Sequence, residues 1–282
     1  MLTTGTSVRE TVLERLSRQL VLIVACMFTL IPVLFLYLNT FKSLSDFFAN
    51  PYGLPQVWRF DNYVQAWTEA NVVVTLRNSI IATVSGVLLN LVLSVPASYA
   101  LARLKFKLRP IVYIMFVGGM VVPIQLILLP LLLVMRDIHV IGSLVSIIIA
   151  YGVLSLPLSI LFLTSFFGTI PVEIEEAATI DGANLGQVLR HIVLPLARPG
   201  IVSVIILTGV WMWNEFIVAL VLATKPSIQT LPVGIMSFFG VYSTDWTLAF
   251  ASVAIAATPF LIAYLLLTRQ FVSGLTAGAV KS

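Results

Sequence analysis

Long apolar runs that contain almost no charge constrain this chain more than any other feature of its sequence. The first run, Leu20–Leu38, has 19 residues and no charged side chain. About 20 apolar residues in a helix cross the hydrocarbon core of a bilayer. Charged residues make up 10% of the 282 residues, against roughly 25% in soluble domains, which is too few to cover a surface that faces water. The sequence therefore predicts an integral membrane protein.

An all-α polytopic fold follows from these runs, because they are continuous and do not alternate as the strands of a β-barrel do. We expect one transmembrane domain, residues 1–282, with six transmembrane helices. The predicted spans are about residues 20–41, 79–101, 111–135, 141–167, 200–222 and 247–268. Pro123, Pro130 and Pro157 lie in the third and fourth spans, and each removes a backbone donor, so kinks are expected there.

A cleaved signal peptide is the alternative for the first run. The apolar region of a signal peptide usually has about 7–15 residues and ends at a small-x-small cleavage site. This run is longer, and the residues that follow it, Tyr37–Phe41, offer no such site. We therefore expect a retained membrane helix.

Lysine and arginine gather in particular loops, which predicts the orientation of the chain. Three arginines precede the first span, and residues 102–110 carry four cations and no acid. The loop 42–78 balances its cations with acids, so it is expected outside. Six spans then place both termini in the cytoplasm, in agreement with Arg269 and Lys281 near the end. Charges placed in this way serve membrane topology and do not indicate nucleic-acid binding.

A polar segment, residues 171–199, lies between the fourth and fifth spans and is therefore expected in the cytoplasm. Pro171 suits the first turn of a helix. Asp181–Gly182 interrupts the helical pattern, and glycine is the common residue at a left-handed helix end. Asn184 followed by Gln187 is typical of a capping pair that starts a second helix. The 171–199 segment is predicted to be a helix, a tight turn and a second helix.

The residues of this helix pair leave two interpretations open. An amphipathic pair resting on the membrane would turn Lys and Arg toward anionic lipid, but the first helix carries only acids: Glu173, Glu175 and Glu176. An acidic surface in the cytoplasm, with Ala177 and Ala178 permitting close approach of another backbone, suits a basic protein partner. Both a surface helix pair and a docking element for another protein remain possible interpretations.

The same segment resembles the EAA loop of permease subunits from binding-protein-dependent ABC importers. The family pattern is Glu-Ala-Ala, a glycine four residues later and Ile-x-Leu-Pro about ten residues after that, and this chain has Glu176–Ala178, Gly182 and Ile192–Pro195. Asp181–Ala183 resembles the carbohydrate-importing branch, which often has Phe at the position of Leu189. In the family this loop is a coupling helix that seats in a cleft of the cytoplasmic ATPase. The resemblance assigns docking to Glu176, Ala177, Ala178, Asp181, Gly182, Leu189, Ile192, Leu194 and Pro195.

Two further stretches carry the resemblance. Residues 209–216, GVWMWNEF, are similar to the Trp-Asn segment in the fifth span of sugar permeases. Residues 271–282, FVSGLTAGAVKS, are similar to the C-terminal tail of the maltose-type small permease, which reaches toward the ATPase dimer interface. The tail residues expected near the ATPase are Gly274, Thr276, Gly278 and Lys281.

Glu215 is the only ionisable residue well inside a predicted span. Such residues are costly in lipid and usually face a cavity or a partner. Its neighbours Trp211, Trp213 and Asn214 suit a sugar path, because aromatic rings stack on sugar faces and amides bond hydroxyls. The alternative is ordinary interfacial tryptophan with Glu215 bonded to a neighbouring helix.

Other polar features have simpler expectations. The mid-span amides of Asn90 and Gln125 are expected to form interhelical hydrogen bonds. The aromatic stretch 50–67 either lies along the membrane interface, which we favour, or contacts an external partner. A single cysteine, Cys26, excludes an intrachain disulfide and a thiol metal cluster. No catalytic set, phosphate-binding loop or metal site is visible, so ATP and Mg²⁺ would be bound by a partner ATPase.

The resemblance implies a type I ABC importer permease, a non-enzymatic subunit that imports a sugar or oligosaccharide by alternating access. It further implies a heterodimer with a second permease, two ATPase subunits and an extracytoplasmic solute-binding protein in a bacterial or archaeal cytoplasmic membrane. A permease of the same class for glycerol phosphate or a polyol is the alternative. A secondary transporter usually needs polar relays at the midplane, and a membrane enzyme needs convergent catalytic groups; neither is evident.

Overall fold

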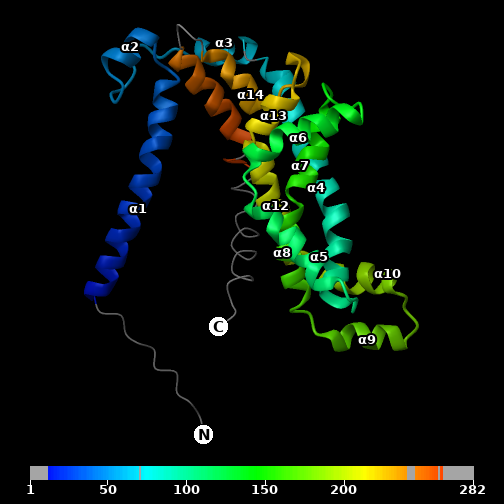
Figure 1. The fold of residues 1–282 in the computed structure, drawn as a ribbon. Helices are drawn as coiled ribbons and strands as arrows, with labels where there is room; N and C mark the ends of the chain where they lie inside the picture. Colours follow the sequence, from blue (N-terminus) through cyan, green and yellow to red (C-terminus); the bar gives the residue numbers. More distant parts are fainter. Residues whose placement is uncertain (1–11, 70, 240–244, 260, 263–282) are drawn as a thin grey trace.

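The computed structural model describes residues 12–69, 71–239, 245–259 and 261–262 of the chain, and every regular element in these residues is a helix. The predicted all-α fold is confirmed. Two helices are long and apolar enough to cross a bilayer, α1 (Val12–Asn39) and α4 (Val72–Arg103). The predicted spans 20–41 and 79–101 overlap these two helices. In Figure 1 the molecule is elongated, with α2 (Leu44–Ala49) and α3 (Asp61–Glu69) at one end and α9 (Val172–Ile180) and α10 (Leu185–Val188) at the other.

Three further apolar stretches are helix pairs with a sharp bend. If each pair is one span, up to five spans lie in the described residues. The pairs are α5 (Arg109–Gly118) and η1 (Gly119–Val121) with α6 (Ile124–Asp137), bent by 108°; α7 (Leu144–Leu154) with α8 (Leu156–Phe167), bent by 41°; and Leu185–Leu196 with α12 (Arg198–Asn214), bent by 76°. The last predicted span, 247–268, coincides in part with the helix Trp246–Pro259 and extends beyond the described residues, so the sixth span stays a prediction.

The bends coincide with two of the three prolines expected to produce kinks. Pro123 is the N-cap of α6, and Pro157 is in the first turn of α8, where a missing N–H costs little. Pro130 lies inside α6, which continues through it without a break. The predicted fifth span, 200–222, contains an unexpected break, because α12 ends at Asn214 and α13 (Ile217–Leu222) starts a new helix.

Helix α4 is the centre of the fold. It packs against α7, α8, α12 and α14, and it supplies a residue to each of three apolar clusters along its length: Val72, Val87 and Tyr99. Other short elements of the described chain are α2 (Leu44–Ala49), α3 (Asp61–Glu69), η3 (Pro226–Ile228), α14 (Leu231–Ile235) and η4 (Met236–Phe238).

Close helix packing depends on small residues at the contacts. A Cβ atom added to Gly152 of α7 would lie 2.8 Å from Cδ2 of Leu89, and one added to Gly200 of α12 would lie 2.6 Å from the ring of Phe166. Nδ2 of Asn90 donates to the Gly152 carbonyl oxygen at 3.1 Å, which confirms the interhelical bond expected for Asn90. Gln125 is exposed and makes no hydrogen bond within the described residues, so the same expectation stays a prediction for it.

Helix α1 lies apart from the rest of the fold along most of its length (Figure 1). None of the residues in its most hydrophobic 18-residue window is buried. Its C-terminal end is held by polar contacts, since Nδ2 of Asn62 donates to the carbonyl oxygens of Thr40 and Lys42, both at 2.8 Å. Within the described residues, the most apolar stretch of α1 is therefore not covered by the rest of the chain.

The loop after α1 is ordered around a buried cation. Nζ of Lys42 donates to the carbonyl oxygens of Asn50 at 2.7 Å and Pro51 at 3.1 Å. Burial lowers the pKa of the Lys42 ammonium, and the carboxylate of Asp46 opposes that shift. Outside this polar centre the aromatic side chains of Tyr52 and Phe60 are exposed. Their exposure fits both the membrane-interface and the external-partner interpretation.

Candidate functional site

The 171–199 segment has the predicted helix–turn–helix structure at one end of the molecule (Figure 1). Helix α9 (Val172–Ile180) is followed by its C-cap Asp181 and then by Gly182, whose φ of +90° is in the left-handed region. Helix α10 (Leu185–Val188) begins with a reciprocal capping box: Asn184 Oδ1 accepts from the Gln187 amide at 3.0 Å, and Gln187 Oε1 accepts from the Asn184 amide at 2.8 Å. The local predictions for the turn and the cap are confirmed.

The second half of the segment leads directly into a predicted membrane span. A π-helical turn, η2 (Leu189–Val193), follows α10, and α11 (Leu194–Leu196) joins it to α12. At the other end, α8 leads into α9 through residues 168–171. A displacement of the 171–199 segment would therefore act on α8 and α12 through the backbone itself.

The residues assigned to ATPase docking divide into two sets by exposure. Five are exposed: Glu176, Ala177, Asp181, Gly182 and Pro195. Four are partly buried: Ala178, Leu189, Ile192 and Leu194. Ala178 and Leu189 pack against the apolar cluster that contains Phe167. The exposed set is available to a partner, while Ala178 and Leu189 pack the segment against the membrane-spanning helices.

Two apolar side chains at the turn were not singled out from the sequence. Ile180 is 86% exposed at the end of α9, and Leu185 is 53% exposed at the start of α10. They flank the Asp181–Gly182 turn, an exposed position at which polar side chains would be solvated and large apolar side chains are not. The presence of large aliphatic residues beside a polar turn was the sequence signal that could have identified them. They give the tip of the segment an apolar surface.

Glu175 does not belong to the acidic surface expected on α9. Its side chain is buried and accepts from Arg103 Nε at 2.7 Å and from the Tyr99 hydroxyl at 2.9 Å. Arg103 Nη2 also donates to the carbonyl oxygen of Ile170 at 2.6 Å. We call these four residues, Tyr99, Arg103, Ile170 and Glu175, the Glu175 cluster. It joins α4 to α9, whereas the sequence pattern indicated only a topology signal for Arg103.

Glu215 occupies the break between α12 and α13. Its carboxylate accepts from the Val218 amide at 2.9 and 3.0 Å and from the Ala219 amide at 3.2 Å, so it caps the first turn of α13. The Tyr151 hydroxyl donates to the Glu215 carbonyl oxygen at 3.1 Å. The side chain is buried in this role, and its acceptors are engaged by backbone N–H groups.

The structure does not bring the four candidate path residues to one place. Asn214 is exposed and bonds the Val210 carbonyl oxygen of its own helix at 2.8 Å. Trp213 packs against the cluster that contains Val72. Trp211 lines a cavity, and its ring meets Tyr151 edge-on at 5.8 Å.

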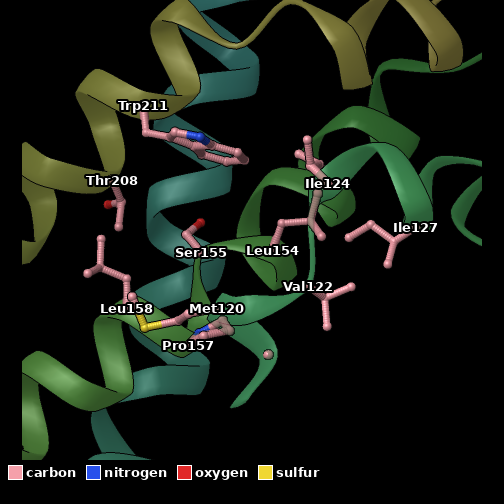
Figure 2. A pocket seen from close by; sticks show the side chains of 11 residues that line it. Met120, Val122, Ile124, Ile127, Leu154, Ser155, Pro157, Leu158, Thr208 and Trp211 are labelled. Atoms are coloured by element: carbon pink, nitrogen blue, oxygen red, sulfur yellow. The ribbon is translucent and has the colours of Figure 1, made fainter. Parts of the chain in front are cut away.

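The cavity beside Trp211 has a volume of about 270 Å³ (Figure 2). The indole lies at one end, and residues of η1, α6, α7, α8 and α12 form the walls. Most of the lining is aliphatic. The hydroxyls of Ser155 and Thr208 are the polar side chains in it, and each donates to a carbonyl oxygen of its own helix, Tyr151 and Val204 respectively. An apolar cavity with one aromatic ring and two acceptor hydroxyls suits a neutral ligand better than a charged one.

The tail residues Gly274, Thr276, Gly278 and Lys281 fall beyond the described residues. Within the described residues, no group of three or more His, Cys, Asp or Glu side chains is placed to hold a metal ion.

Residues 94–276 match the family model of the binding-protein-dependent transport system inner membrane component. The chain belongs to this family. The match includes the Glu175 cluster, the whole 171–199 segment and the cavity beside Trp211. As a permease component the chain is the membrane part of an importer, and ATP hydrolysis is carried out by separate ATPase subunits.

Curated relatives of this permease align along most of its length. The diacetylchitobiose uptake system permease protein DasC of Streptomyces coelicolor is 35% identical over 89% of this chain and 91% of that protein. The sulfoquinovosyl glycerol transport system permease protein SmoH of Agrobacterium fabrum is 35% identical over 89% of each. A chain from the crystal structure of a bacterial ABC transporter involved in the import of the acidic polysaccharide alginate has a TM-score of 0.80 at 22% identity, covering 93% of this permease and 99% of that chain. That likeness supports the permease fold.

Proposed function

We propose that this permease forms one half of the pore of an ATP-driven importer that carries a sugar or oligosaccharide into the cell. Its 171–199 segment docks on a cytoplasmic ATPase. ATP binding closes the ATPase pair and moves the segment as a rigid body, and the pore then alternates between inward-open and outward-open forms. The observation that carries the proposal is the exposed surface of this segment, with its turn at Gly182, directly continuous with α8 and α12.

The distribution of charge supports a cytoplasmic position for the 171–199 segment. The start of α5, which follows the cationic loop 102–110, lies at the same end of the molecule as α9 and α10 (Figure 1). Helix α1 extends toward that end as well. By the positive-inside rule this end faces the cytoplasm, and both termini belong on that side.

The partners follow from the surfaces that the chain leaves uncovered. A second permease would bury part of the apolar surface that α1 and α5 expose. Two ATPase subunits would engage the two permeases, one segment each, and an extracytoplasmic binding protein would deliver the substrate to the opposite face. The names of DasC and SmoH, which describe diacetylchitobiose and sulfoquinovosyl glycerol transport, support a carbohydrate as the substrate.

The cavity beside Trp211 is the part of the candidate path that the geometry supports. An indole face stacks on the apolar face of a sugar ring, and the hydroxyl oxygens of Ser155 and Thr208 accept hydrogen bonds from sugar hydroxyls. Trp213, Asn214 and Glu215 act in this proposal by holding the α12–α13 break in place. Trp211→Phe and Trp213→Phe form a matched pair of variants. A rise in the half-saturating substrate concentration for Trp211→Phe alone supports the assignment, and equal values for both contradict it.

Co-purification tests the proposed assembly. The permease carries its affinity tag in an outer loop, is expressed from its native operon and is extracted in mild detergent, and the co-purifying chains are identified by mass spectrometry. A second permease and an ATPase in equal amounts support the proposal. A lone permease in native lipid nanodiscs, with no ATPase, overturns it.

Uptake by the reconstituted complex separates the substrate classes. Proteoliposomes with ATP inside and binding protein outside should accumulate a labelled oligosaccharide, and unlabelled sugar should compete. Competition by glycerol phosphate or a polyol, with none by sugars, would move the assignment to the alternative solute class.

A further inference from the structure

Helix α4 has no covalent link to the 171–199 segment, yet the Glu175 cluster binds it to that segment. Arg103 and Tyr99 are in the last turns of α4, and Glu175 is 72 and 76 residues away from them in sequence. The side chains of Arg103 and Glu175 are 14% and 9% exposed. Removing either partner of a pair so shielded from water costs far more than breaking a surface pair, because the other charge is then left buried without compensation.

The geometry of the cluster restrains α9 in several directions. Oε1 of Glu175 receives Arg103 Nε, and Oε2 receives the Tyr99 hydroxyl. The same guanidinium holds the Ile170 carbonyl oxygen, just before α9 begins. Donors that converge on a single carboxylate and on the adjacent backbone oppose both sliding and rotation of α9 relative to α4.

The other end of α4 is fastened to the outer face. Nδ2 of Asn78 donates to the carbonyl oxygens of Ser227 at 2.9 Å and Gln229 at 3.0 Å. The Ser79 hydroxyl accepts from the Leu231 amide at 2.8 Å. These bonds attach the first turns of α4 to the stretch of η3 and α14. The 32 residues of α4 are helical throughout and span about 48 Å at 1.5 Å per residue.

We propose that Glu175 is a positioning residue that fastens α4 to the coupling segment, so that α4 carries each displacement of that segment to the outer stretch 226–235. This inference rests on the proposed function. In it, α8 and α12 follow the ATPase through their backbone connections, and α4 follows through the Glu175 cluster. Without the cluster the ATPase would still dock and hydrolyse ATP, but the outer end of the pore would follow its cycle poorly.

The test uses the complete importer in proteoliposomes and measures solute imported per ATP hydrolysed. Glu175→Gln keeps the side chain's size and removes its charge, and Arg103→Gln removes the partner. Asp137→Asn is the matched control, since it breaks an exposed Arg136–Asp137 pair of the same chemistry. We expect both cluster variants to co-purify with the ATPase and to lose about tenfold or more in solute per ATP. The control should keep the wild-type ratio.

A double variant and a variant near the other end of α4 test the inference further. If Glu175 and Arg103 act as a pair, Glu175→Gln with Arg103→Gln should be no worse than the poorer single variant. Asn78→Ala, which touches nothing on α9, should also lower solute per ATP while ATPase binding stays intact. If Glu175→Gln does not assemble, the test is made with Tyr99→Phe instead. This variant removes the hydroxyl donor to Glu175 and leaves the ring packed against Phe167.

The outcomes distinguish the inference from the proposed function. A wild-type ratio in Glu175→Gln, or in Tyr99→Phe where that variant decides, overturns the inference and leaves the importer assignment standing. Transport that falls only in proportion to the amount of assembled complex also overturns it, because the cluster would then serve stability alone. Wild-type permease that recruits no ATPase overturns both.

Discussion

At the scale of single residues, the 171–199 segment depends on two kinds of contact, one between close neighbours in the chain and one between residues far apart in the sequence. Gly182 and the Asn184–Gln187 pair act on neighbours within a few positions, so their conformations follow from residue type alone. The bond between Arg103 and Glu175 joins residues 72 positions apart, and nothing in either local pattern specifies the other. Glu175 therefore looked like one of three surface acids, although only Glu173 and Glu176 are exposed.

Gly200 offers a residue-scale test of helix packing. Gly200→Ala should lower the free energy of unfolding by about 1–3 kcal/mol, because the new Cβ would overlap the Phe166 ring where α12 crosses α8. The measurement is the apparent melting temperature in detergent, taken from the loss of the monodisperse fraction as the temperature rises. Gly118→Ala is the control, since a Cβ at Gly118 meets nothing within 4 Å. Equal melting temperatures for the two variants would show that Phe166 moves freely aside.

Lys42 offers a second test, in the loop after α1. Lys42→Met keeps much of the apolar stem and deletes the ammonium, leaving the Asn50 and Pro51 carbonyl oxygens without this donor. We expect a loss of about 1–3 kcal/mol, measured as a lower melting temperature of the purified complex. Arg59→Met removes an exposed cation that pairs with Asp61 and should change stability little. A stable Lys42→Met protein would mean that water replaces the amine.

At the scale of elements, apolar runs located the membrane helices but did not show where they break. Pro123 and Pro157 mark two breaks, because a proline at a helix start sacrifices no hydrogen bond. The break after Asn214 has no proline or glycine, and it depends on the Glu215 carboxylate folding back on the amides of α13. A sequence pattern of Trp, Asn, Glu and Phe indicates interface or substrate chemistry as readily as a cap, which is why this break was not foreseen.

The capping role of Glu215 predicts a local loss of order. Glu215→Ala should destabilise the start of α13 by about 0.5–2 kcal/mol, because the Val218 and Ala219 amides lose their acceptors. Hydrogen exchange of residues 217–222 measures this directly. Glu69→Ala at the exposed end of α3 serves as the control. Unchanged exchange at Val218 in Glu215→Ala would contradict the capping role.

The turn in the 171–199 segment predicts a specific loss of ATPase binding. Gly182→Ala forces a side chain into a left-handed conformation, which costs about 1–2 kcal/mol, and the turn should relax by moving α9 relative to α10. We expect weaker ATPase association, measured by titrating detached ATPase onto permease in nanodiscs. Gly186→Ala, within α10, has only ordinary contact with Asn184 and should bind normally. Equal affinity in both variants would count against docking at this turn.

At the scale of the whole molecule, α4 is a scaffold and α1 is an outlier. The former contributes to all three apolar clusters, while the latter is unburied along its most hydrophobic stretch. Composition predicted that both would lie in the membrane, but it gave no indication of which one would be central. That difference arises from the small and polar side chains of α4, such as Gly86, Asn90 and Ser94, which permit close packing that the bulky surface of α1 does not.

The exposed apolar surface predicts that assembly stabilises the chain. Permease purified with its partners should melt at a higher temperature than permease expressed alone, because partner binding favours the folded state by mass action. Differential scanning fluorimetry at equal detergent and lipid content measures the difference. If the isolated chain melted at the same temperature as the complex, lipid alone would be sufficient to cover the exposed apolar surface of α1 and its neighbours.

The buried amide of Asn90 has a consequence for the synthesis and membrane insertion of the protein. Its bonding partners, the Gly152 carbonyl oxygen and the Ser159 hydroxyl, lie 62 and 69 residues further along the chain. At about 5–20 residues per second, a ribosome makes the first of them roughly 3–12 s after it makes Asn90. During that interval the Asn90 amide lacks its two interhelical partners and has only the Ser94 hydroxyl of its own helix as a neighbour. We therefore expect α4 to be released into lipid together with α7 and α8 rather than before them.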